Sequence, residues 1–365
     1  MIIDVGSSSV GACFLERQPG HKPVLSFVKR VPIGKGTEET RENIAQLAVG
    51  SLTTLLKDYE QQARPGAVRM VLASPWYASR IKFVTSKAEK PVKISRASIV
   101  NTVREYRTKE GAAEAALSGT PMESMVTQVY VNGYPTALKH SVFGTTLRLH
   151  LYESAADAAF LERARAAVLK VFPSVKLTFH SFPLLAFIVL RDIRDEENFT
   201  FVDAGGEVTD VAVVHRDSLR FLGTFPKGSL FLVRAVASGK SNADSASRLS
   251  LYARDELSPQ EEAVFKKSFD DAIAPWVKDY VDTIAVAQTD TAIPQTTFIA
   301  ADVEELRWFG RVIESVRGVF PARPILMSPD FFQAHIALGE SASYDAFLSV
   351  GALFAYEKGE ALLQA

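Results

Sequence analysis

Two short segments combine aspartate, glycine and serine in a pattern suited to holding an anion such as phosphate. The segments are Asp4-Val5-Gly6-Ser7-Ser8-Ser9 and Asp203-Ala204-Gly205-Gly206. Glycine has no Cβ, so its backbone can turn tightly and approach a phosphate group closely. Successive backbone N–H groups could form an anion-binding concavity there, and the hydroxyls of Ser7 and Ser8 add donors. The alternative is a tight hairpin that binds nothing, because turns use the same residue types.

These two segments occupy equivalent positions in an internal repeat. Residues 2–36 and residues 200–228 both run from an apolar strand through Asp-x-Gly and a polar turn to a second and a third strand. Each copy ends in Pro-x-Gly, and Gly228 closes the second copy. The alternating apolar positions and turn residues predict an antiparallel meander of three strands in each copy. Two such copies predict two similar lobes.

Helix and strand patterns after each meander extend the repeat. Apolar residues recur at helical spacing over residues 38–62, and residues 67–74 form an apolar strand that Pro75 closes. The second copy continues with helices beginning near residue 230, at 244–256 and at 260–287, a strand at 296–301 and a helix at 303–316. The order strand–strand–strand–helix–strand is therefore predicted in both lobes.

A block of different character separates the two copies. Its expected elements are strands at 81–84, 125–131, 139–152 and 176–180, and helices at 95–106 and 155–172. We interpret the block as an inserted α+β unit, with a continuation of the first lobe as the alternative. The first lobe is predicted to span residues 1–75 and to be closed by a helix at 340–358. The insert is predicted at 76–176. The second lobe is predicted at 177–339, with a reduced helical subdomain at about 229–290.

Composition narrows the class of protein. The chain has 365 residues, of which 47% are hydrophobic and 23% charged, and its net charge is −1. Such a chain can build two cores, and it carries no overall field that would attract nucleic acid. The single cysteine, Cys13, cannot form an internal disulfide, and the longest apolar run, at 182–190, is too short to span a bilayer. We expect a cytoplasmic protein without a transmembrane segment.

The repeat and its two Asp-x-Gly motifs resemble those of the actin/Hsp70/sugar-kinase superfamily, in which a nucleotide lies between two such lobes. This resemblance implies an α/β class and a duplicated, two-lobed actin-like (ribonuclease H-like) fold. Within the superfamily, Val131-Asn132-Gly133-Tyr134 and Gly144-Thr145-Thr146-Leu147 are similar to the small inserted subdomain of the bacterial proteins FtsA and PilM. The chain is thereby identified as a candidate member of the FtsA/PilM type.

The resemblance implies ATP and Mg²⁺ as cofactors. The metal would be held through its water by Asp4 and Asp203, because Mg²⁺ prefers carboxylate ligands and keeps several waters. The implied nucleotide-binding residues are Gly6, Ser7, Ser8, Ser9, Gly205, Gly206, Gly228, Ser245, Arg248 and Ala301.

The adenosine-binding motif departs from the superfamily pattern. Members that bind adenosine usually carry a Gly-Gly pair after a late strand, whereas this chain has Ala300 and Ala301. The two methyl groups occupy space that the nucleotide needs, and Asp302 and Glu304 add negative charge beside phosphates. Asp302 also has a simple alternative role as the N-cap of the following helix. These departures predict weak or lost affinity for ATP.

The sequence also offers no clear catalytic residue for the hydrolysis of ATP. His180 is the one titratable candidate after the strand that links the lobes, where it could orient water or accept a proton. The alternative is that its imidazole satisfies local hydrogen bonds. We expect at most a weak ATPase.

These features favour a scaffold or adaptor of the FtsA/PilM type, docked to a membrane-associated division, pilus or secretion machine through the cytoplasmic tail of a partner. Residues 357–365 contain two leucines and no basic face, so they cannot supply stable membrane binding themselves. Any location at the inner face of the membrane would therefore depend on the partner. One alternative is a phosphotransferase like the sugar or acetate kinases, although Asp192 and Asp195 are poorly placed for catalysis. Another is an ATP-driven polymerising scaffold, so self-association stays open.

Overall fold

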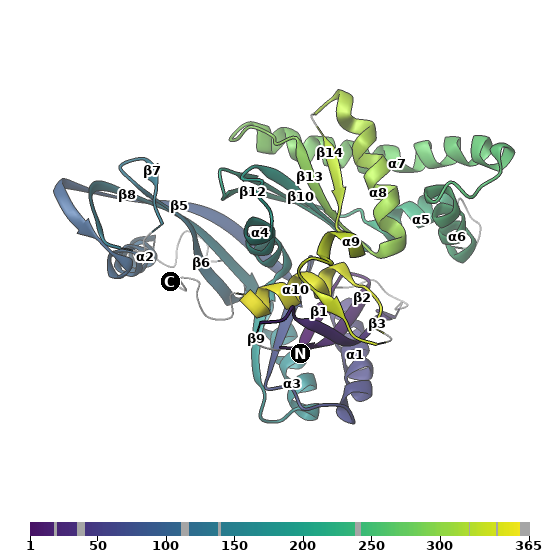
Figure 1. Cartoon of the computed structure of the whole chain (residues 1–365), viewed down its shortest axis with the longest axis horizontal. Coiled ribbons are helices and arrows are strands. Elements are labelled where there is room, and N and C mark those ends of the chain that lie inside the picture. The colour runs from purple at the N-terminus through teal and green to yellow at the C-terminus, as the bar shows by residue number, and fades with distance from the viewer. Residues whose placement is uncertain are drawn as a thin grey trace.

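The computed structural model describes residues 1–17, 20–34, 41–110, 117–137, 140–237, 242–320, 322–340 and 342–357. Its strands form three separate sheets (Figure 1). The first lobe surrounds the N-terminus in the lower part of Figure 1, the second lobe lies above it, and the third sheet extends to the left. The predicted closing residue 358 and the chain end through 365 lie outside the described residues.

The first lobe contains a sheet with the strand order β15-β3-β2-β1-β4-β9. The strands are β1 (Ile2–Val5), β2 (Ser9–Glu16), β3 (Val24–Pro32), β4 (Ala67–Leu72), β9 (Lys176–Ser181) and β15 (Ala337–Leu338). β1, β2 and β3 form an antiparallel meander, whereas β4 lies parallel to β1 and β9 parallel to β4. The first predicted meander is confirmed.

The second lobe repeats this order as β12-β11-β10-β13-β14. Its strands are β10 (Phe199–Ala204), β11 (Thr209–His215), β12 (Ser218–Phe225), β13 (Thr296–Ala300) and β14 (Arg323–Leu326). The antiparallel meander is again followed by two parallel strands, as in the first lobe. All six residues of β10 are buried, because helices cover both faces of its sheet. The duplication predicted from the sequence is confirmed.

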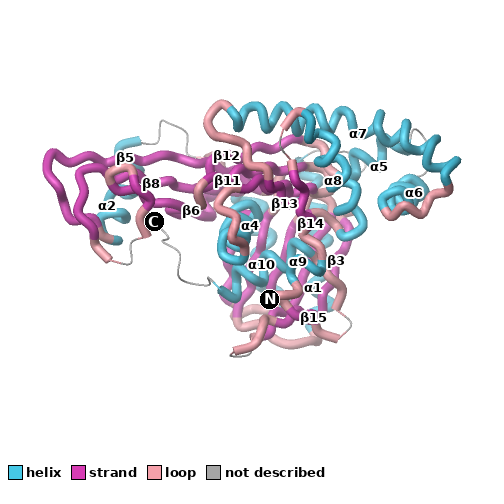
Figure 2. The backbone as a smooth tube through the Cα atoms, turned by 45° about the horizontal axis from the view of Figure 1, so that its top comes forward, coloured by secondary structure: helices cyan, strands magenta, loops and turns pink. Residues whose placement is uncertain are grey.

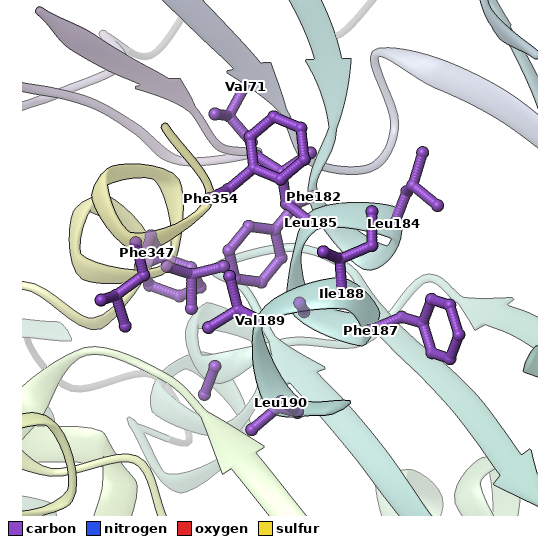
Figure 3. Packing of buried hydrophobic residues seen from close by; sticks show 14 of the residues in the cluster. Val71, Phe182, Leu184, Leu185, Phe187, Ile188, Val189, Leu190, Phe347 and Phe354 are labelled. Carbon is purple, nitrogen blue, oxygen red and sulfur yellow. The ribbon is translucent and has the colours of Figure 1, made fainter. Parts of the chain in front are cut away.

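An apolar layer joins the two lobes. It consists of α4 (Phe182–Ile193) and α10 (Ala346–Glu357), whose side chains pack with those of both large sheets. Figure 3 shows Phe354 beside Val71 of the first sheet and Phe182 near Phe347 of α10. The first nine residues of α4 are all buried, which explains why that segment is apolar around its whole circumference. The apolar run at 182–190 is thus an internal helix.

Helices on the outer faces complete the lobes. In the first lobe, α1 (Arg41–Glu60) packs beside α3 (Ala158–Val171). The second lobe carries α5 (Ser229–Ala237), α6 (Asn242–Ala253), α7 (Pro259–Gln288), α8 (Val303–Ser315), the 3₁₀ turn Val316–Gly318 and α9 (Pro329–Phe332). Ser258 and Glu261 form a capping box at the start of α7, where Pro259 occupies the first turn. Within the described residues, none of the helices combines the length and apolarity needed to cross a bilayer.

The third sheet belongs to the inserted block and has the order β5-β8-β6-β7. Its antiparallel strands are β5 (Tyr77–Ile94), β6 (Thr120–Val131), β7 (Tyr134–Pro135) and β8 (Val142–Ala156), with α2 (Arg96–Glu110) against one face. We call this sheet and α2 the inserted unit. In Figure 2 it extends away from the two lobes, whereas α3, which follows β8, packs on α1 of the first lobe. The domain limits given above remain a prediction.

The inserted unit also contacts the second lobe through a buried polar pair. His150 of β8 is 1% exposed, and its Nδ1 lies 2.5 Å from the Ser218 hydroxyl of β12. Nearby, Arg220 of β12 donates to the Tyr130 hydroxyl at 3.3 Å. Burial, with the positive charges of Arg220 and Arg148, lowers the pKa of His150 from 6.5 to about 3. His150 is therefore neutral in the folded protein near neutral pH.

We expect His150 to make the folded protein less stable as the pH falls. Below about pH 6.5 the unfolded chain binds a proton at His150 that the folded protein does not, down to a pH of about 3. This contribution approaches about 1.4 kcal/mol per pH unit. Urea unfolding of the wild type and of His150→Asn at pH 7, 6 and 5 should show the wild type losing stability relative to the variant. A difference that does not change with pH would contradict the assignment.

Candidate functional site

The two Asp-x-Gly hairpins face each other between the lobes. The β1–β2 hairpin comes from the first sheet and the β10–β11 hairpin from the second, and both line one cavity of about 20 Å³. The predicted residues that line this cavity are Asp4, Gly6, Ser7, Ser8, Ser9, Asp203, Gly205 and Gly206. Asp4 and Asp203 are therefore brought together from opposite lobes.

The hairpin loops touch each other directly. The backbone N–H of Glu207 donates to the Ser7 hydroxyl at 2.9 Å. A Cβ built on Gly206 would overlap the side chain of Ser8, so this close approach requires glycine. Trp76 donates its indole N–H to the Gly6 carbonyl at 2.7 Å and holds the first loop from the other side. The loops thus form a closed junction between the lobes.

Gly228 supports the second loop from behind. A Cβ at this position would overlap the carbonyl oxygen of Gly205. The next two backbone N–H groups, those of Ser229 and Leu230, donate to the carbonyls of Gly205 and Gly206 at 2.9 and 2.8 Å. These first N–H groups of α5 are therefore used within the protein. Gly228 positions the second loop but does not line the small cavity.

Arg30 of β3 binds the first-lobe side of the cleft, and the sequence reasoning did not single it out. Its guanidinium donates to Asp4 at 2.9 Å and to the Ser9 hydroxyl at 2.9 Å. It also forms a bidentate salt bridge with the two carboxylate oxygens of Asp345, at 2.7 and 3.1 Å. A Cβ on Gly11 would lie 2.8 Å from the guanidinium, so glycine there leaves room for Arg30. The two carboxylates raise the pKa of Arg30 further, against the effect of burial.

The carboxylates of Asp4 and Asp203 are buried in the cleft with too few hydrogen-bond donors or positive charges around them. Asp4 is 1% exposed and Asp203 is 3% exposed, and one oxygen of each has no hydrogen-bond partner among the described residues. Burial raises the pKa of Asp4 to about 6, although Arg30 opposes this shift. Burial, followed by the negative charges of Asp210 and Asp4, raises the pKa of Asp203 well above 3.8. Both unsatisfied oxygens belong to carboxylates that line the small cavity.

Asp210 forms a polar bridge between the lobes. It accepts hydrogen bonds from the Ser74 hydroxyl at 2.7 and 2.8 Å and from the Tyr77 hydroxyl at 3.0 Å. Thr224 of its own lobe adds a third donor at 2.5 Å. Burial raises the pKa of Asp210, and these hydrogen bonds oppose the shift. Asp210 therefore connects its lobe to the segment that leads into the inserted unit.

The residues expected around adenosine lie outside the small cavity. Ala301 is buried after β13, Ser245 is buried in α6, and Arg248 is exposed on α6. A second cavity, of about 550 Å³, lies nearby against α5, α6, α8 and β3. Its lining includes Trp308, Leu230 and Val28 together with Arg30 and four acidic residues, Asp302, Glu304, Glu305 and Asp345, so among the described residues the acidic ones outnumber the basic one. This acidic lining disfavours an anionic ligand.

Asp302 occupies the N-cap position of α8, but its side chain forms no capping hydrogen bond. The side chain is exposed and lines both the small and the larger cavity. Although the residue is exposed, the surrounding cleft residues partly desolvate its carboxyl, which raises the pKa of Asp302, and Arg30 opposes that shift. Asp302 is therefore the N-cap residue, as the alternative predicted, but its side chain does not accept the hydrogen bond that usually stabilises a helix start.

The arrangement does not fit a magnesium–nucleotide complex. A cavity of about 20 Å³ has room for roughly one water molecule, far less than a triphosphate needs. The Ser7–Glu207 hydrogen bond crosses the space where phosphates would enter between the loops. Arg30 already occupies one oxygen of Asp4, which the resemblance assigns to the metal.

His180 lies away from this cleft, in β9. Its Nδ1 is 3.1 Å from Glu123 of β6, and its Nε2 is 3.0 Å from the Thr178 hydroxyl. Glu123 also accepts from Ser154 at 2.8 Å, and from both the backbone N–H and the hydroxyl of Ser181. Both ring nitrogens of His180 have local partners, and the residue does not line the small cavity. The carboxylate of Glu123 instead joins the inserted unit to the first lobe.

Comparison with solved structures identifies the architecture as actin-like. The chain is similar to a chain of the PilM–PilN type IV pilus biogenesis complex, with 14% identity and a TM-score of 0.61 over 97% of this chain and 94% of that one. It is also similar to the ethanolamine utilization protein EutJ from Carboxydothermus hydrogenoformans, with 10% identity and a TM-score of 0.45 over 89% and 83%. No family model matches the chain, and the comparison with curated proteins gives no match. The predicted duplicated two-lobed actin-like α/β fold is confirmed.

We expect Asp203→Asn to stabilise the protein at alkaline pH. The folded pKa of Asp203 is raised, so the folded state binds a proton more tightly than the unfolded chain, and this advantage disappears as the pH rises through the folded pKa. At pH 8 the variant should gain about 1–3 kcal/mol in urea unfolding, because a buried unpaired charge is removed. The gain should shrink at pH 5. Asp290→Asn, at an exposed position, is the control. A loss of stability at pH 8 would contradict the raised pKa of Asp203.

Removing the Glu123 carboxylate should destabilise the junction between the inserted unit and the first lobe. The side chain is 6% exposed, so Glu123→Ala leaves buried donors on Ser154 and Ser181 without an acceptor. We expect a loss of about 3 kcal/mol in urea unfolding, and a smaller loss for Glu123→Gln. The control is Glu162→Ala, whose exposed pair with Arg165 contributes under about 0.5 kcal/mol. Equal effects at the two positions would refute this role.

Proposed function

We propose that this protein is an actin-like scaffold or adaptor that docks a membrane-associated machine by binding the cytoplasmic segment of a partner. The similarity to a chain of the PilM–PilN complex, at a TM-score of 0.61 over 97% of this chain, carries the proposal. That structure belongs to a type IV pilus biogenesis complex, so a pilus or secretion machine is the favoured setting. A division machine is the other setting that the FtsA resemblance implies. On this proposal the protein lies at the inner face of the membrane through its partner.

Exposed aromatic side chains on the inserted unit support an adaptor. Among the described residues, the large aromatic side chains that are strongly exposed are Phe83, Tyr134 and Phe143, at 54%, 75% and 70%. All three belong to the inserted unit, on β5, β7 and β8. Aromatic residues are enriched at the buried centres of protein interfaces. We assign the partner's contact to this unit, and we propose that its occupant is a segment of a PilN-type protein.

A phosphotransferase is not favoured. Such an enzyme needs a nucleotide and a second substrate side by side, whereas the hairpins enclose about 20 Å³. Asp192 and Asp195 lie at and beyond the end of α4 and do not line that cavity. The resemblance implies ATP and Mg²⁺, but their binding would require the hairpin loops to separate. Weak ATPase activity and nucleotide-driven assembly would require the same separation.

Fluorescence anisotropy tests the proposed contact. A labelled peptide covering the cytoplasmic segment of the PilN-type protein from the same organism should bind the wild type. The double variant Tyr134→Ser/Phe143→Ser should bind at least about tenfold more weakly, because each lost aromatic contact is worth about 1 kcal/mol or more. Both side chains are exposed, so circular dichroism and unfolding should remain close to wild type.

The matched control replaces two exposed apolar residues of α7, in Val264→Ser/Val286→Ser, whose side chains are 76% and 59% exposed. We expect this control to bind the peptide as the wild type does. Absence of binding to the wild type would overturn the proposed function. Equal weakening by both double variants would overturn its assignment to the inserted unit.

A further inference from the structure

We infer that Arg30 is a built-in cation that holds the cleft closed in place of a metal–nucleotide complex, so that the lobes stay together without a nucleotide. This inference concerns the state of the cleft and is independent of which partner the inserted unit binds. It rests on the charges that line the cleft, on the contacts that cross it and on the space left between the loops.

The charge balance of the cleft depends on one residue. Among the described residues that line the small cavity, Arg30 is the only basic one, and it faces four aspartates, Asp4, Asp203, Asp210 and Asp302. The side chain of Arg30 is 18% exposed and those of Asp4 and Asp345 are 2% and 9% exposed, so the ion pairs are shielded from water. Two carboxylates that face each other in a desolvated site repel strongly unless a cation lies between or beside them. A guanidinium supplies that charge permanently, because it cannot lose its proton.

The geometry of Arg30 is that of a fixed structural element. Its three nitrogens each donate, to Asp4 of β1, to Ser9 of β2 and to Asp345. Asp345 in turn accepts from the backbone N–H of Leu348 in the first turn of α10 at 3.0 Å. One guanidinium thereby ties the first hairpin to the helix that lies between the lobes. A side chain held by four hydrogen bonds is not free to contact an incoming phosphate.

The remaining contacts across the cleft close it without a ligand. The backbone N–H of Glu207 donates to the Ser7 hydroxyl, and the Ser74 hydroxyl donates to Asp210, so each lobe donates a hydrogen bond to the other. Gly206 lies so close to Ser8 that not even a methyl group fits between the loops. A nucleotide would have to break these contacts and would bring negative charge to a cleft already rich in carboxylates.

The test compares Arg30→Met with wild type. Methionine keeps much of the apolar volume of the arginine side chain and removes the charge. We expect the variant to unfold at a temperature at least about 5 °C lower, and its amides at residues 4–10 and 203–209 to exchange hydrogen faster. We also expect 5 mM MgCl₂ alone to raise the unfolding temperature of the variant but not that of the wild type, because the carboxylates of the cleft then lack a cation.

Two proteins serve as controls. Lys29→Met removes a neighbouring cation of the same strand that pairs with Asp58 on the exposed surface, and it should show neither effect. Arg30→Lys keeps a positive charge and should show a smaller loss without the magnesium response. Should Arg30→Met fail to fold, the contrast between Arg30→Lys and Lys29→Met decides the stability claim.

Calorimetric titration of the wild type with Mg-ATP decides the nucleotide claim. The inference requires no binding heat up to millimolar nucleotide and an unchanged unfolding temperature. A dissociation constant of about 1 mM or lower for the wild type would overturn it. Arg30→Met as stable as Lys29→Met would overturn it independently.

Discussion

The structure depends on the burial of α4 and α10 between the two large sheets. Each large sheet has an apolar inner face that must be covered, and in this chain the two helices cover the inner faces of both sheets at once. Phe182 contacts Phe201 of the second sheet and Phe347 of α10, with ring centroids 5.9 and 5.3 Å apart. Because this layer is continuous across the lobes, their separation would expose apolar surface. The hairpins therefore meet at a distance that the packed layer sets.

This constraint explains why the cleft is small and polar. The Asp-x-Gly bends lie at corresponding ends of two equivalent sheets, so closing the apolar layer drives their aspartates into one confined space. Two kinds of contact reduce the resulting repulsion between the aspartates. Asp4 is paired with Arg30, and Asp210 is surrounded by the hydroxyls of Ser74, Tyr77 and Thr224. Asp203 has one oxygen without a hydrogen-bond partner among the described residues, and burial raises its pKa well above 3.8.

Local sequence patterns predicted most of the architecture because they reflect local physics. Alternating apolar residues around each Asp-x-Gly bend gave both meanders, and the helix predicted at 260–287 corresponds to α7 at Pro259–Gln288. The predicted strand at 81–84 is much shorter than β5, which spans Tyr77–Ile94. β5 is an edge strand whose outer half is mostly exposed and rich in lysine, so it lacks the alternation by which a half-buried strand is recognised. The helix at 155–172 was recognised, but its packing against α1 depends on contacts distant in the sequence.

The candidate site was predictable only in part, for the same reason. Both hairpins carry a visible motif, so the convergence of Asp4 and Asp203 follows from the repeat. Arg30 carries no motif, because its significance comes from Asp345, which lies 315 residues away in the sequence. The acidic character of the larger cavity likewise joins Asp302, Glu304 and Glu305 of one segment with Asp345 of another. Charge compensation between distant segments has no local signature.

The closed cleft and the inserted unit are mechanically connected. Tyr77 is the first residue of β5, and its hydroxyl binds Asp210 in the second lobe, while Ser74 just before it binds the same carboxylate. On the other strands, Glu123 anchors the unit to the first lobe and His150 anchors it to the second. The unit is thus held by buried polar contacts on both lobes, and any opening of the cleft would strain the start of β5. A scaffold that must present one surface in one orientation benefits from such an attachment, and an internal cation such as Arg30 keeps that orientation independent of nucleotide supply.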